Sequence, residues 1–561
     1  MSHTVRRLLI ILAVVLALIS IAGIVFVRVW LDPLVKEKLV ALTAESSHEM
    51  YALKIDQLHI NILTGSVNAG GIQLNTDTTR WEQMHQEKPD ETPLKIDLQI
   101  TRLRIKNISW IRYWRTKNLD LRGIQIVNPQ IDLVSIQDTA QEKVPQVDTP
   151  AQHILERLPL LIAPFANHVH IGYVAITNGK ISMQNLLRNK SSYQQADSIN
   201  GVLSHFNIAA RDTTENTTAL YCKHILLSIR NFEWYPAGTV YGYRVKSVAI
   251  DGQDEAIKLE DITVHPKISD AEFMQRLTFR IPRVKVKMKE ILIRKFDLFR
   301  ALHKQEWMME TVTVESARIN VYQNKNLPLP RKQMPNEMFR NLKPYLNIDT
   351  ILIRNSNILY TELLEDDKGQ LEFEHTNGVI LNITNDTLKM SDKTPASINA
   401  RAELMGAGLL DLSLDIPLLS KTFDCDVAAH LGEIDMTYLN RLVEDKNNFR
   451  VESGKSEKIV MKAQVRNGLA QGKIEATYDD LKISVLREKD GSKKKLVSAV
   501  ANIILRGKNE RGSPDQPFKV GTIYYRREPT DGILRYIWRS AQTGLIETLV
   551  PSNISKGKMP G

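Results

Sequence analysis

The sequence contains few cysteines and too little glycine and proline for an irregular chain. Its 561 residues include 2 Cys, 27 Gly and 22 Pro. This composition excludes a disulfide-dense scaffold, every zinc site built from cysteines, and a collagen-like chain. The balance of 74 basic and 64 acidic residues gives a net charge of +10, too small for this length to identify an anionic partner. We expect a folded chain. The sequence is compatible with one disulfide between Cys222 and Cys425 and equally with two reduced thiols.

Motifs that carry a reaction are also missing. The chain has no G-x-x-x-x-G-K-[ST], H-E-x-x-H, G-x-S-x-G or G-x-G-x-x-G segment, which disfavours an enzyme. His168 and His170 alternate on an expected strand, but no further ligand follows at metal-site spacing. Asp424 and Asp426 flank Cys425 without a nearby nucleophile or cation. We interpret both pairs as structural and expect no metal and no cofactor.

Long apolar runs are rare, with one exception at the N-terminus. Leu8 to Val27 is a stretch of 20 residues without a charge, which as a helix would be about 30 Å long, the thickness of a bilayer core. We expect one transmembrane anchor over residues 1–30, with apolar positions that include Leu8, Leu12, Leu16, Ile19, Ile24 and Val27. The alternative is a cleaved signal peptide, because Ser20-Ile21-Ala22 has small-x-small spacing. The anchor interpretation predicts a single-pass membrane protein with most of the chain exported.

Beyond this run the apolar period changes from helical to strand-like. Residues from Pro33 to about Tyr51 have helical spacing. Apolar and polar residues then alternate, as in Leu98-Gln99-Ile100 and Leu103-Arg104-Ile105, which indicates strands with one apolar face. The expected fold class is mainly β, an antiparallel sheet with a few short helices.

Four segments repeat one pattern, with apolar residues at relative positions 0, 2, 7 and 9. They are Ile124, Ile126, Ile131, Leu133; Val174, Ile176, Ile181, Met183; Val312, Val314, Ile319, Val321; and Ile351, Ile353, Ile358, Tyr360. Turn-forming triplets such as Asn128-Pro129-Gln130 and Asn178-Gly179-Lys180 separate the second and third apolar positions. We interpret each segment as a β-hairpin with its apolar residues on one face. The alternative is that they are ordinary hairpins of an antiparallel sheet.

Two expected strands carry cations on one face only. In Arg283-Val284-Lys285-Val286-Lys287-Met288-Lys289 four cations alternate with three apolar residues, and Arg102, Arg104 and Lys106 repeat the arrangement. Nucleic-acid binding would call for interleaved aromatic residues, which these strands lack. We interpret the cations as a solvated outer face and expect no nucleic-acid partner, with attraction to lipid headgroups as the alternative.

The chain divides at polar and proline-rich segments. We expect a first β segment with a leading helix (31–150), a second (151–322), a Pro-rich linker or excursion (323–345) and a third (346–528). Residues 529–561 predict a C-terminal amphipathic helix, because Leu534, Ile537, Trp538, Ala541, Leu545 and Leu549 recur at intervals of three and four. We expect this helix to cap the sheet, with membrane contact as the alternative.

Late in the chain a set of short motifs resembles the AsmA-like family of bacterial envelope proteins (bridge-like lipid transfer, AsmA/TamB-type). The motifs are Leu431-Gly432-Glu433-Ile434-Asp435 continuing to Asn440, Val451-Glu452-Ser453-Gly454, Gly468 to Gly472, and Tyr478-Asp479-Asp480-Leu481. The resemblance implies a strand that enters a short helix ending near Asn, a turn that opens the next strand, and a following hairpin. It also implies an elongated, curved antiparallel β-groove that carries phospholipid between two membranes, and no catalytic residues. In such a groove the apolar residues of the four repeated segments, Tyr360 apart, would form the lipid-binding lining.

Two functions from different classes follow. The first is an inner-membrane-anchored periplasmic protein that binds phospholipid or another acyl lipid in an apolar groove and assists lipid transport or outer-membrane homeostasis. Its lining would hold lipid by area, because each buried CH₂ contributes about 0.8 kcal/mol. The second is a non-enzymatic scaffold for outer-membrane proteins, whose sheets close into dry sandwiches and whose edges recruit partners by strand addition. Envelope proteins are partners under both hypotheses.

Overall fold

A computed structural model describes most of the chain. The described residues are 32–87, 92–137, 163, 166–187, 190–209, 222–363, 368–440, 449–485, 506–512 and 517–549. The chain forms two compact units, here called unit 1 (Met1–Leu259 with Leu302–Lys304) and unit 2 (Glu260–Ala301 with Gln305–Gly561).

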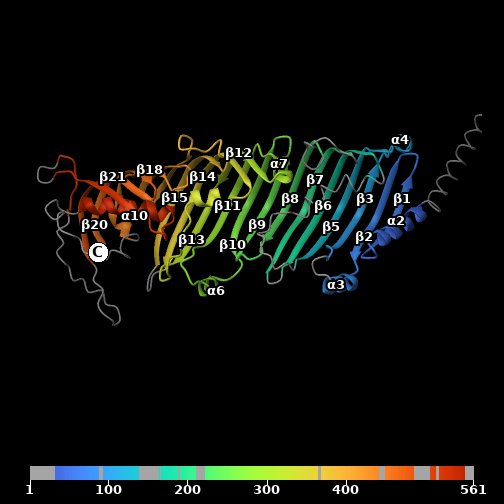
Figure 1. Cartoon of the computed structure of the whole chain (residues 1–561), viewed down its shortest axis with the longest axis horizontal. Helices are drawn as coiled ribbons and strands as arrows, with labels where there is room; N and C mark the ends of the chain where they lie inside the picture. Colours follow the sequence, from blue (N-terminus) through green and yellow to red (C-terminus); the bar gives the residue numbers. More distant parts are fainter. Residues whose placement is uncertain are drawn as a thin grey trace, which may run out of the picture. The chain divides into compact units, whose positions relative to one another are not determined.

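Unit 1 is a sheet flanked by short helices (Figure 1). Its elements are α2 (Asp32–Ser46), β1 (Tyr51–Asn61), β2 (Ser66–Thr76), α3 (Thr78–Glu87), β3 (Lys95–Lys106), α4 (Trp110–Thr116), β4 (Asn118–Leu121), β5 (Gly123–Gln137), β6 (His168–Leu187), β7 (Lys190–Ala209), β8 (His224–Tyr235) and β9 (Tyr241–Asp251). The strands lie in the order β1, β2, β3, β5, β6, β7, β8, β9, and neighbours are antiparallel except that β5 and β6 are parallel. Strand β10 (Ala256–Pro266) begins in unit 1 and ends in unit 2.

Unit 2 is also mainly β. Its elements include α6 (Asp270–Gln275), β11 (Arg283–Arg294), α7 (Leu298–His303), β12 (Glu306–Glu315), β13 (Arg318–Asn324), α8 (Pro335–Arg340), β14 (Tyr345–Leu363), β15 (Lys368–Thr384), β16 (Ala396–Leu404), β17 (Gly408–Ile416), β18 (Cys425–Leu431), β19 (Ile434–Asp435), η4 (Met436–Leu439), β20 (Phe449–Arg466), β21 (Leu469–Val485), β22 (Val520–Arg526) and α10 (Ile533–Leu549). β12 and β13 pair with β14 in parallel, and the strands from β14 to β22 continue antiparallel.

The predicted transmembrane helix finds no support in this fold. Among the described residues, no helix has the length and apolarity needed to cross a membrane. The longest described helix, α10, has 17 residues and is interrupted by charged side chains. The predicted segment Leu8–Val27 itself lies outside the described residues. The fold class is therefore corrected to a mainly β chain without a spanning helix among its described elements, and the inner-membrane localisation drawn from that helix is corrected with it.

The predicted repeated hairpins are also corrected, because each copy is one extended stretch of chain. Copies that follow one another pair in parallel and in register: Ile124 with Val174, Ile126 with Ile176, Ile131 with Ile181 and Leu133 with Met183. In unit 2 the same holds for Val312 with Ile351, Val314 with Ile353, Ile319 with Ile358 and Val321 with Tyr360. A hairpin would pair the two halves of one copy with each other. The sheets are mixed, and the predicted antiparallel fold is wrong at these pairs.

A single residue with positive φ explains the spacing of the repeat. At relative position 4 stand Asn128 (φ 49°), Asn178 (φ 52°), Ser316 (φ 53°) and Asn355 (φ 44°). In a regular strand, positions 0 and 7 would point to opposite faces. A residue in the left-handed region bends the strand and shifts the alternation by one, as in a β-bulge. Positions 7 and 9 therefore return to the face that positions 0 and 2 occupy.

The same shift is visible in the packing of β1 and β2. Ile55 and Leu58, an odd number of residues apart, both belong to one buried cluster with Ala69 and Ile72, while Asp56 and Gln57 between them are exposed. The partner of Asp56 on β2 is Gly71, with φ 59°, where an added Cβ would lie 2.1 Å from the Asp56 carboxylate. The shift is thus a property of neighbouring strands and not of the four repeats alone.

The largest core lies in unit 2 under α10. The helix α10 itself confirms the predicted C-terminal helix. Ile474, Ile523, Tyr478 and Tyr536 are almost fully buried in this core. The helix approaches the sheet at Gly544, where an added Cβ would lie 2.4 Å from the Ile474 side chain. Residues 323–345, expected as a linker or excursion, contribute the fully buried Met334 to the same core.

Candidate functional site

The residues predicted to line a groove lie in register on one face of each unit. All of Ile124, Ile126, Ile131, Leu133, Val174, Ile176, Ile181, Met183, Val312, Val314, Ile319, Val321, Ile351, Ile353 and Ile358 are half-buried. None of them belongs to the fully buried residues that make up the cores. A residue packed between two sheets would lose nearly all its exposure. These side chains therefore belong to a face that is only partly covered.

In unit 1 this face continues far beyond the predicted residues. One row pairs strand by strand through Leu58, Ala69, Leu103, Ile126, Ile176, Gly201, Leu227 and Ile250. With strands about 4.8 Å apart, the row extends on the order of 34 Å. We call this surface the aliphatic face of unit 1. The sequence pattern did not identify the other members of this face. Their strands share the shift in alternation but do not have apolar residues at relative positions 0, 2, 7 and 9.

Unit 2 has an equivalent row, whose burial increases along the sheet. The row runs through Ile291, Val314, Ile353, Gly378, Ala400, Leu412, Ala429 and Met461. It continues from Met461 to Ile474, and these two side chains are 4% and 1% exposed. The helix α10 covers this end, whereas Val314 and Ile353 at the other end are half-buried. The half-buried part is the aliphatic face of unit 2.

A polar network borders the aliphatic face of unit 2. Lys325 Nζ lies 3.2 Å from Glu362 Oε2, and both side chains are less than one-fifth exposed. The Tyr360 hydroxyl donates to Glu362 Oε1 at 2.5 Å. Burial, with the Glu362 charge in addition, raises the pKa of Tyr360. Burial lowers the pKa of Lys325, an effect that Glu362 opposes. The Tyr360 hydroxyl, at relative position 9 of the repeat, is therefore neutral and lies beside the Lys325–Glu362 ion pair.

Asparagine side chains join the bent positions across the strands. Asn178 Nδ2 donates to Asn128 Oδ1 at 3.0 Å, and Asn178 N–H donates to Asn200 Oδ1 at 2.9 Å. In unit 2 the Asn355 N–H donates to Asn377 Oδ1 at 3.0 Å. Asparagine tolerates positive φ and its amide satisfies backbone groups that the bend leaves without a strand partner. These residues position the aliphatic side chains and do not line the face.

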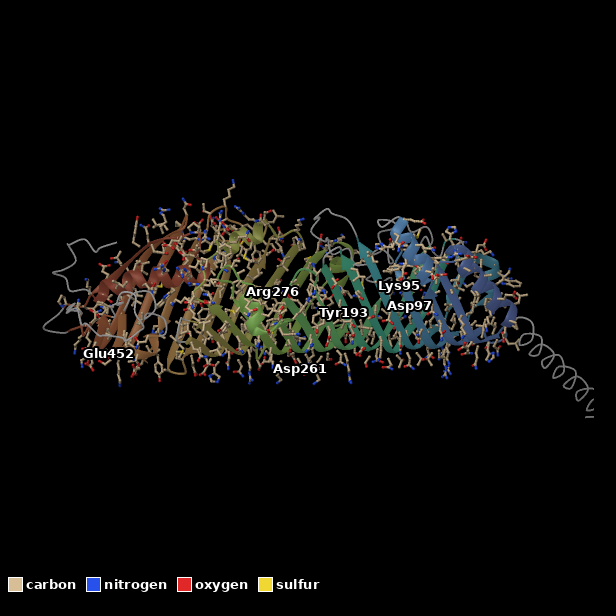
Figure 2. All side chains as sticks on the ribbon, turned by 90° about the horizontal axis from the view of Figure 1, so that it is seen from below. Lys95, Asp97, Tyr193, Asp261, Arg276 and Glu452 are labelled. Atoms are coloured by element: carbon tan, nitrogen blue, oxygen red, sulfur yellow. The ribbon has the colours of Figure 1, made fainter. Side chains whose placement is uncertain are left out.

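The opposite face of each unit carries polar and charged side chains together with some exposed apolar ones, such as Val202 and Leu226 in unit 1. Lys95 and Asp97 on β3 and Tyr193 on β7 belong to it (Figure 2). The predicted cationic strand β11 also contributes here, with Lys285, Lys287 and Lys289 exposed; Arg283, by contrast, is buried against the Phe273 ring.

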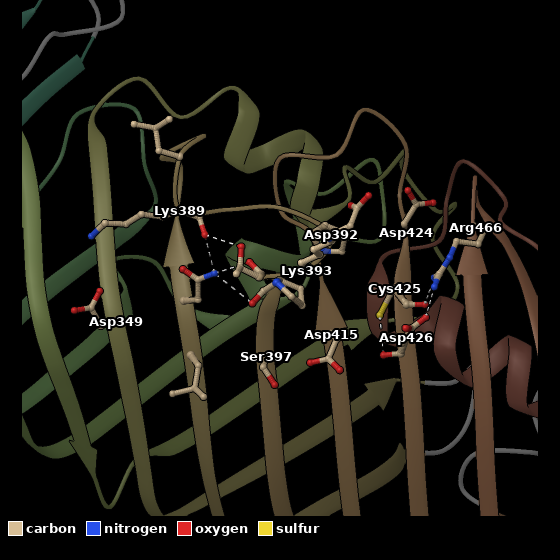
Figure 3. Close-up of a pocket in the computed structure, with 16 residues that line it drawn as sticks. Asp349, Lys389, Asp392, Lys393, Ser397, Asp415, Asp424, Cys425, Asp426 and Arg466 are labelled. Atoms are coloured by element: carbon tan, nitrogen blue, oxygen red, sulfur yellow. Dashed lines mark hydrogen bonds and ion pairs between the residues drawn. The ribbon is translucent and has the colours of Figure 1, made fainter.

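A cavity with a volume of about 1250 Å³ opens on this opposite face of unit 2. Asp349, Asp415, Asp426, Lys393 and Arg466 are among its lining residues (Figure 3). Arg466 forms an ion pair with Asp426 at 2.7 Å. The charges are mixed and the cavity is open to solvent, so it has the character of a wet surface depression.

The residue pairs singled out for metal or acid chemistry have structural partners. Desolvation raises the pKa of Asp424, but hydrogen bonds from the Asn467 N–H and two hydroxyls outweigh it and leave the pKa below its usual value. Burial raises the pKa of the Cys222 thiol to about 11 and that of Cys425 to about 12. Neither cysteine forms a disulfide, so the pairing that the sequence left open is absent.

One group of potential metal-ligand residues was not predicted from the sequence. Glu374, His375 and Glu403 place ligand atoms within 4.8 Å of one another, and it is the one such group in the described part of the chain. His375 Nδ1 lies 3.2 Å from Glu403 Oε2. His168 and His170 do not take part. Glu403 comes from the neighbouring strand β16, 28 residues from His375, so sequence spacing gave no signal.

The motifs behind the family resemblance have defined roles in the fold. The Asn440 amide donates to the Val451 carbonyl at 2.7 Å and accepts from the Val451 N–H at 2.6 Å, which joins the short helix η4 to β20. Gly454 has φ 144°, and an added Cβ there would lie 3.1 Å from Leu481 Cα. Leu481 and Tyr478 are both buried. These residues hold the C-terminal sheet together.

Comparison of the sequence with models of known protein families gives no match, and comparison with curated proteins gives none either. The resemblance to the AsmA-like family therefore stays a prediction. The two aliphatic faces are the features of the molecule that point to a function.

Proposed function

We propose that this chain binds acyl lipids, phospholipids first among them, on the aliphatic faces of its two units and thereby assists lipid transport or outer-membrane homeostasis. The observation that carries the proposal is the in-register row across eight strands of unit 1, aliphatic at every position except Gly201, whose members from the centre of the row onward are half-buried. A row on the order of 34 Å exceeds the roughly 15 Å depth of one bilayer leaflet's hydrocarbon. It therefore offers room for complete acyl chains.

The energetics favour a ligand that is held by area. Each acyl CH₂ transferred from water to an aliphatic surface contributes about 0.8 kcal/mol when fully buried. The lining is mostly aliphatic, without charged groups inside the row, so affinity would increase with the buried acyl area and would not require one particular chain length or double-bond position. Such a surface suits carriage of many related lipids better than selection of one. The proposal assigns no covalent reaction to the chain.

Two observations weigh against the scaffold alternative, in which sheet edges recruit partners by strand addition. At the β22 edge, the Thr522 N–H donates to Glu547 Oε2 at 2.6 Å and the Tyr524 N–H to Thr543 Oγ1 at 3.3 Å. At the β1 edge, the Ile60 N–H donates to Asp32 Oδ1 at 2.9 Å. Side chains from α10 and α2 thus occupy donors that an added strand would need.

The test is the lipid content of the purified full chain. Ile176→Asp and Val314→Asp place a charge on the aliphatic faces, and Ala175→Asp and Thr313→Asp place the same charge one residue away on the opposite face. Lipid extracted from detergent-purified protein is measured by mass spectrometry, with circular dichroism as the check on folding. We expect less lipid per protein for the first pair and an unchanged amount for the second. Equal lipid content in all four folded variants would refute the proposal.

A further inference from the structure

The three most exposed large apolar side chains of unit 1, together with Ile62, gather at one end of its strands. Leu63 is 89% exposed, Trp114 80%, Ile111 79% and Ile62 50%. Ile62 and Leu63 lie in the turn between β1 and β2, and Ile111 and Trp114 lie on α4. We call these four residues the end patch. Fully exposed Trp and Ile side chains are unfavourable in water, and a cluster of them marks a contact surface.

The two segments of the end patch are fixed against each other. The Ile108 N–H, just before α4, donates to the Gly65 carbonyl of the turn at 2.7 Å. An added Cβ on Gly65 would lie 2.3 Å from the Ile108 carbonyl oxygen, so the backbones are in close contact. Figure 1 shows α4 at the end of the sheet where β3 finishes and where β1 turns into β2. The patch is therefore a built surface on ordered backbone.

The helix α4 presents this surface by its own periodicity. Trp110 and Tyr113 are half-buried, while Ile111 and Trp114, also three residues apart, point away from the sheet. The helix ends at Lys117, which has φ 58° and donates its N–H to the Tyr113 carbonyl. The exposed apolar face is thus opposite the side that packs on unit 1.

Cations flank the patch on the side formed by α4. Arg112, Arg115 and Lys117 all lie in or directly after α4, and residues 107–117 contain no acidic side chain. Arg112 forms an ion pair with Asp120 at 2.9 Å, and Lys117 Nζ lies 5.3 Å from the centre of the Tyr113 ring. The segment retains a net positive charge after the Asp120 carboxylate is counted.

We propose that the end patch docks unit 1 onto the surface of a lipid bilayer that carries anionic headgroups. Trp, Tyr and Ile with adjacent Arg and Lys are the composition of segments that lie in the membrane interface, where rings sit at headgroup level and cations meet phosphates. A protein partner suits the patch less well, because four side chains fall short of the roughly 800 Å² that each partner buries in a standard interface. The inference goes beyond the aliphatic face and uses none of its residues.

A site-specific probe tests the docking. Ile111→Cys is labelled with an environment-sensitive fluorophore in the full chain, since both native thiols are buried. The matched control is Leu388→Cys, at an apolar residue of unit 2 that is 95% exposed. Vesicles of phosphatidylcholine alone and with phosphatidylglycerol are titrated in, with spin-labelled lipid to measure depth. The label reports on α4 itself, whichever other segment contacts the vesicle.

We expect a blue shift and quenching by interfacial spin labels at position 111, stronger with phosphatidylglycerol, and neither effect at position 388. Arg115→Glu should weaken the titration roughly 25-fold, because each cation near an anionic surface contributes a factor of about five and a reversal counts twice.

A label that stays in water with both vesicles, or an unchanged titration for Arg115→Glu, would overturn the inference. A blue shift that grows with protein concentration in the absence of lipid would overturn it in favour of a protein contact. These outcomes concern docking alone. Loss of co-purified lipid in Ile176→Asp is a separate result and tests the proposed function.

Discussion

Replacing one isoleucine on the aliphatic face and one in the core of the same unit should have very different effects on stability. Ile353 on β14 is half-buried, whereas Ile474 on β21 is 1% exposed beneath α10. Truncation to Ala removes the same atoms at both positions. The comparison therefore isolates what covers each side chain.

The expected magnitudes follow from burial. A fully buried Ile→Ala change removes about 2–5 kcal/mol through lost transfer energy and a residual cavity. At Ile353 water already reaches the side chain and no closed cavity forms, so we expect about 1 kcal/mol. A difference of about 2 kcal/mol corresponds to about 0.7 M in the urea midpoint, if m is about 3 kcal/mol/M.

The assay is urea unfolding of delipidated full-length protein, followed by circular dichroism. Ile474→Ala should lower the midpoint clearly, and Ile353→Ala should lower it little. Added lipid should then raise the midpoint of the unsubstituted protein more than that of Ile353→Ala, because a ligand of the folded state stabilises it in proportion to its affinity. Equal destabilisation by both substitutions would mean that Ile353 is packed in a dry core, and the lipid interpretation would fail.

Three further outcomes follow from particular contacts. Gly521→Ala should unfold unit 2 at lower urea than Gly532→Ala, because an added Cβ at position 521 would lie 2.0 Å from a carbonyl oxygen of α10 and at position 532 nothing lies within 3.9 Å. Cys222 and Cys425, buried and with raised thiol pKa values, should react with a thiol reagent at pH 8 only after unfolding; rapid reaction of native protein would contradict their burial. Burial raises the pKa of Tyr478 to about 12, so the folded state holds this proton more tightly than the unfolded one. Its contribution to stability should be present below pH 10 and lost as the pH rises toward 12, and Tyr478→Phe should remove that dependence in alkaline unfolding curves.

Much of the fold follows from periodicity, and the main error has a physical cause. Alternating residues such as Leu98, Ile100, Leu103 and Ile105 predicted β3, and intervals of three and four predicted α10. The apolar pattern also identified side chains that share one face. It did not distinguish a hairpin from a bent strand, because Asn and Gly favour a turn and a single left-handed residue equally. The better signal was that Asn128 and Asn178 stand at the same repeat position, as in-register parallel neighbours should.

Other features depend on contacts that sequence spacing does not encode. The end patch joins Leu63 to Ile111 through a backbone contact between two loops, and the cluster of Glu374, His375 and Glu403 joins two strands. The partial exposure of Ile176 and its neighbours is likewise set by what does and does not pack over them. Alternation alone is the same for a groove and for a closed sandwich.

Photocrosslinking along a single strand tests the central claim most directly. A photoreactive amino acid is placed in turn at 174, 175, 176, 180 and 181 of β6, and lipid adducts of the full chain are detected by mass spectrometry. The account predicts adducts at 174, 176 and 181 and none at 175 and 180, because the bend at Asn178 (φ 52°) shifts the alternation by one. Adducts at 174, 176 and 180 would contradict the shared face, and the absence of adducts at all five positions would contradict lipid binding there.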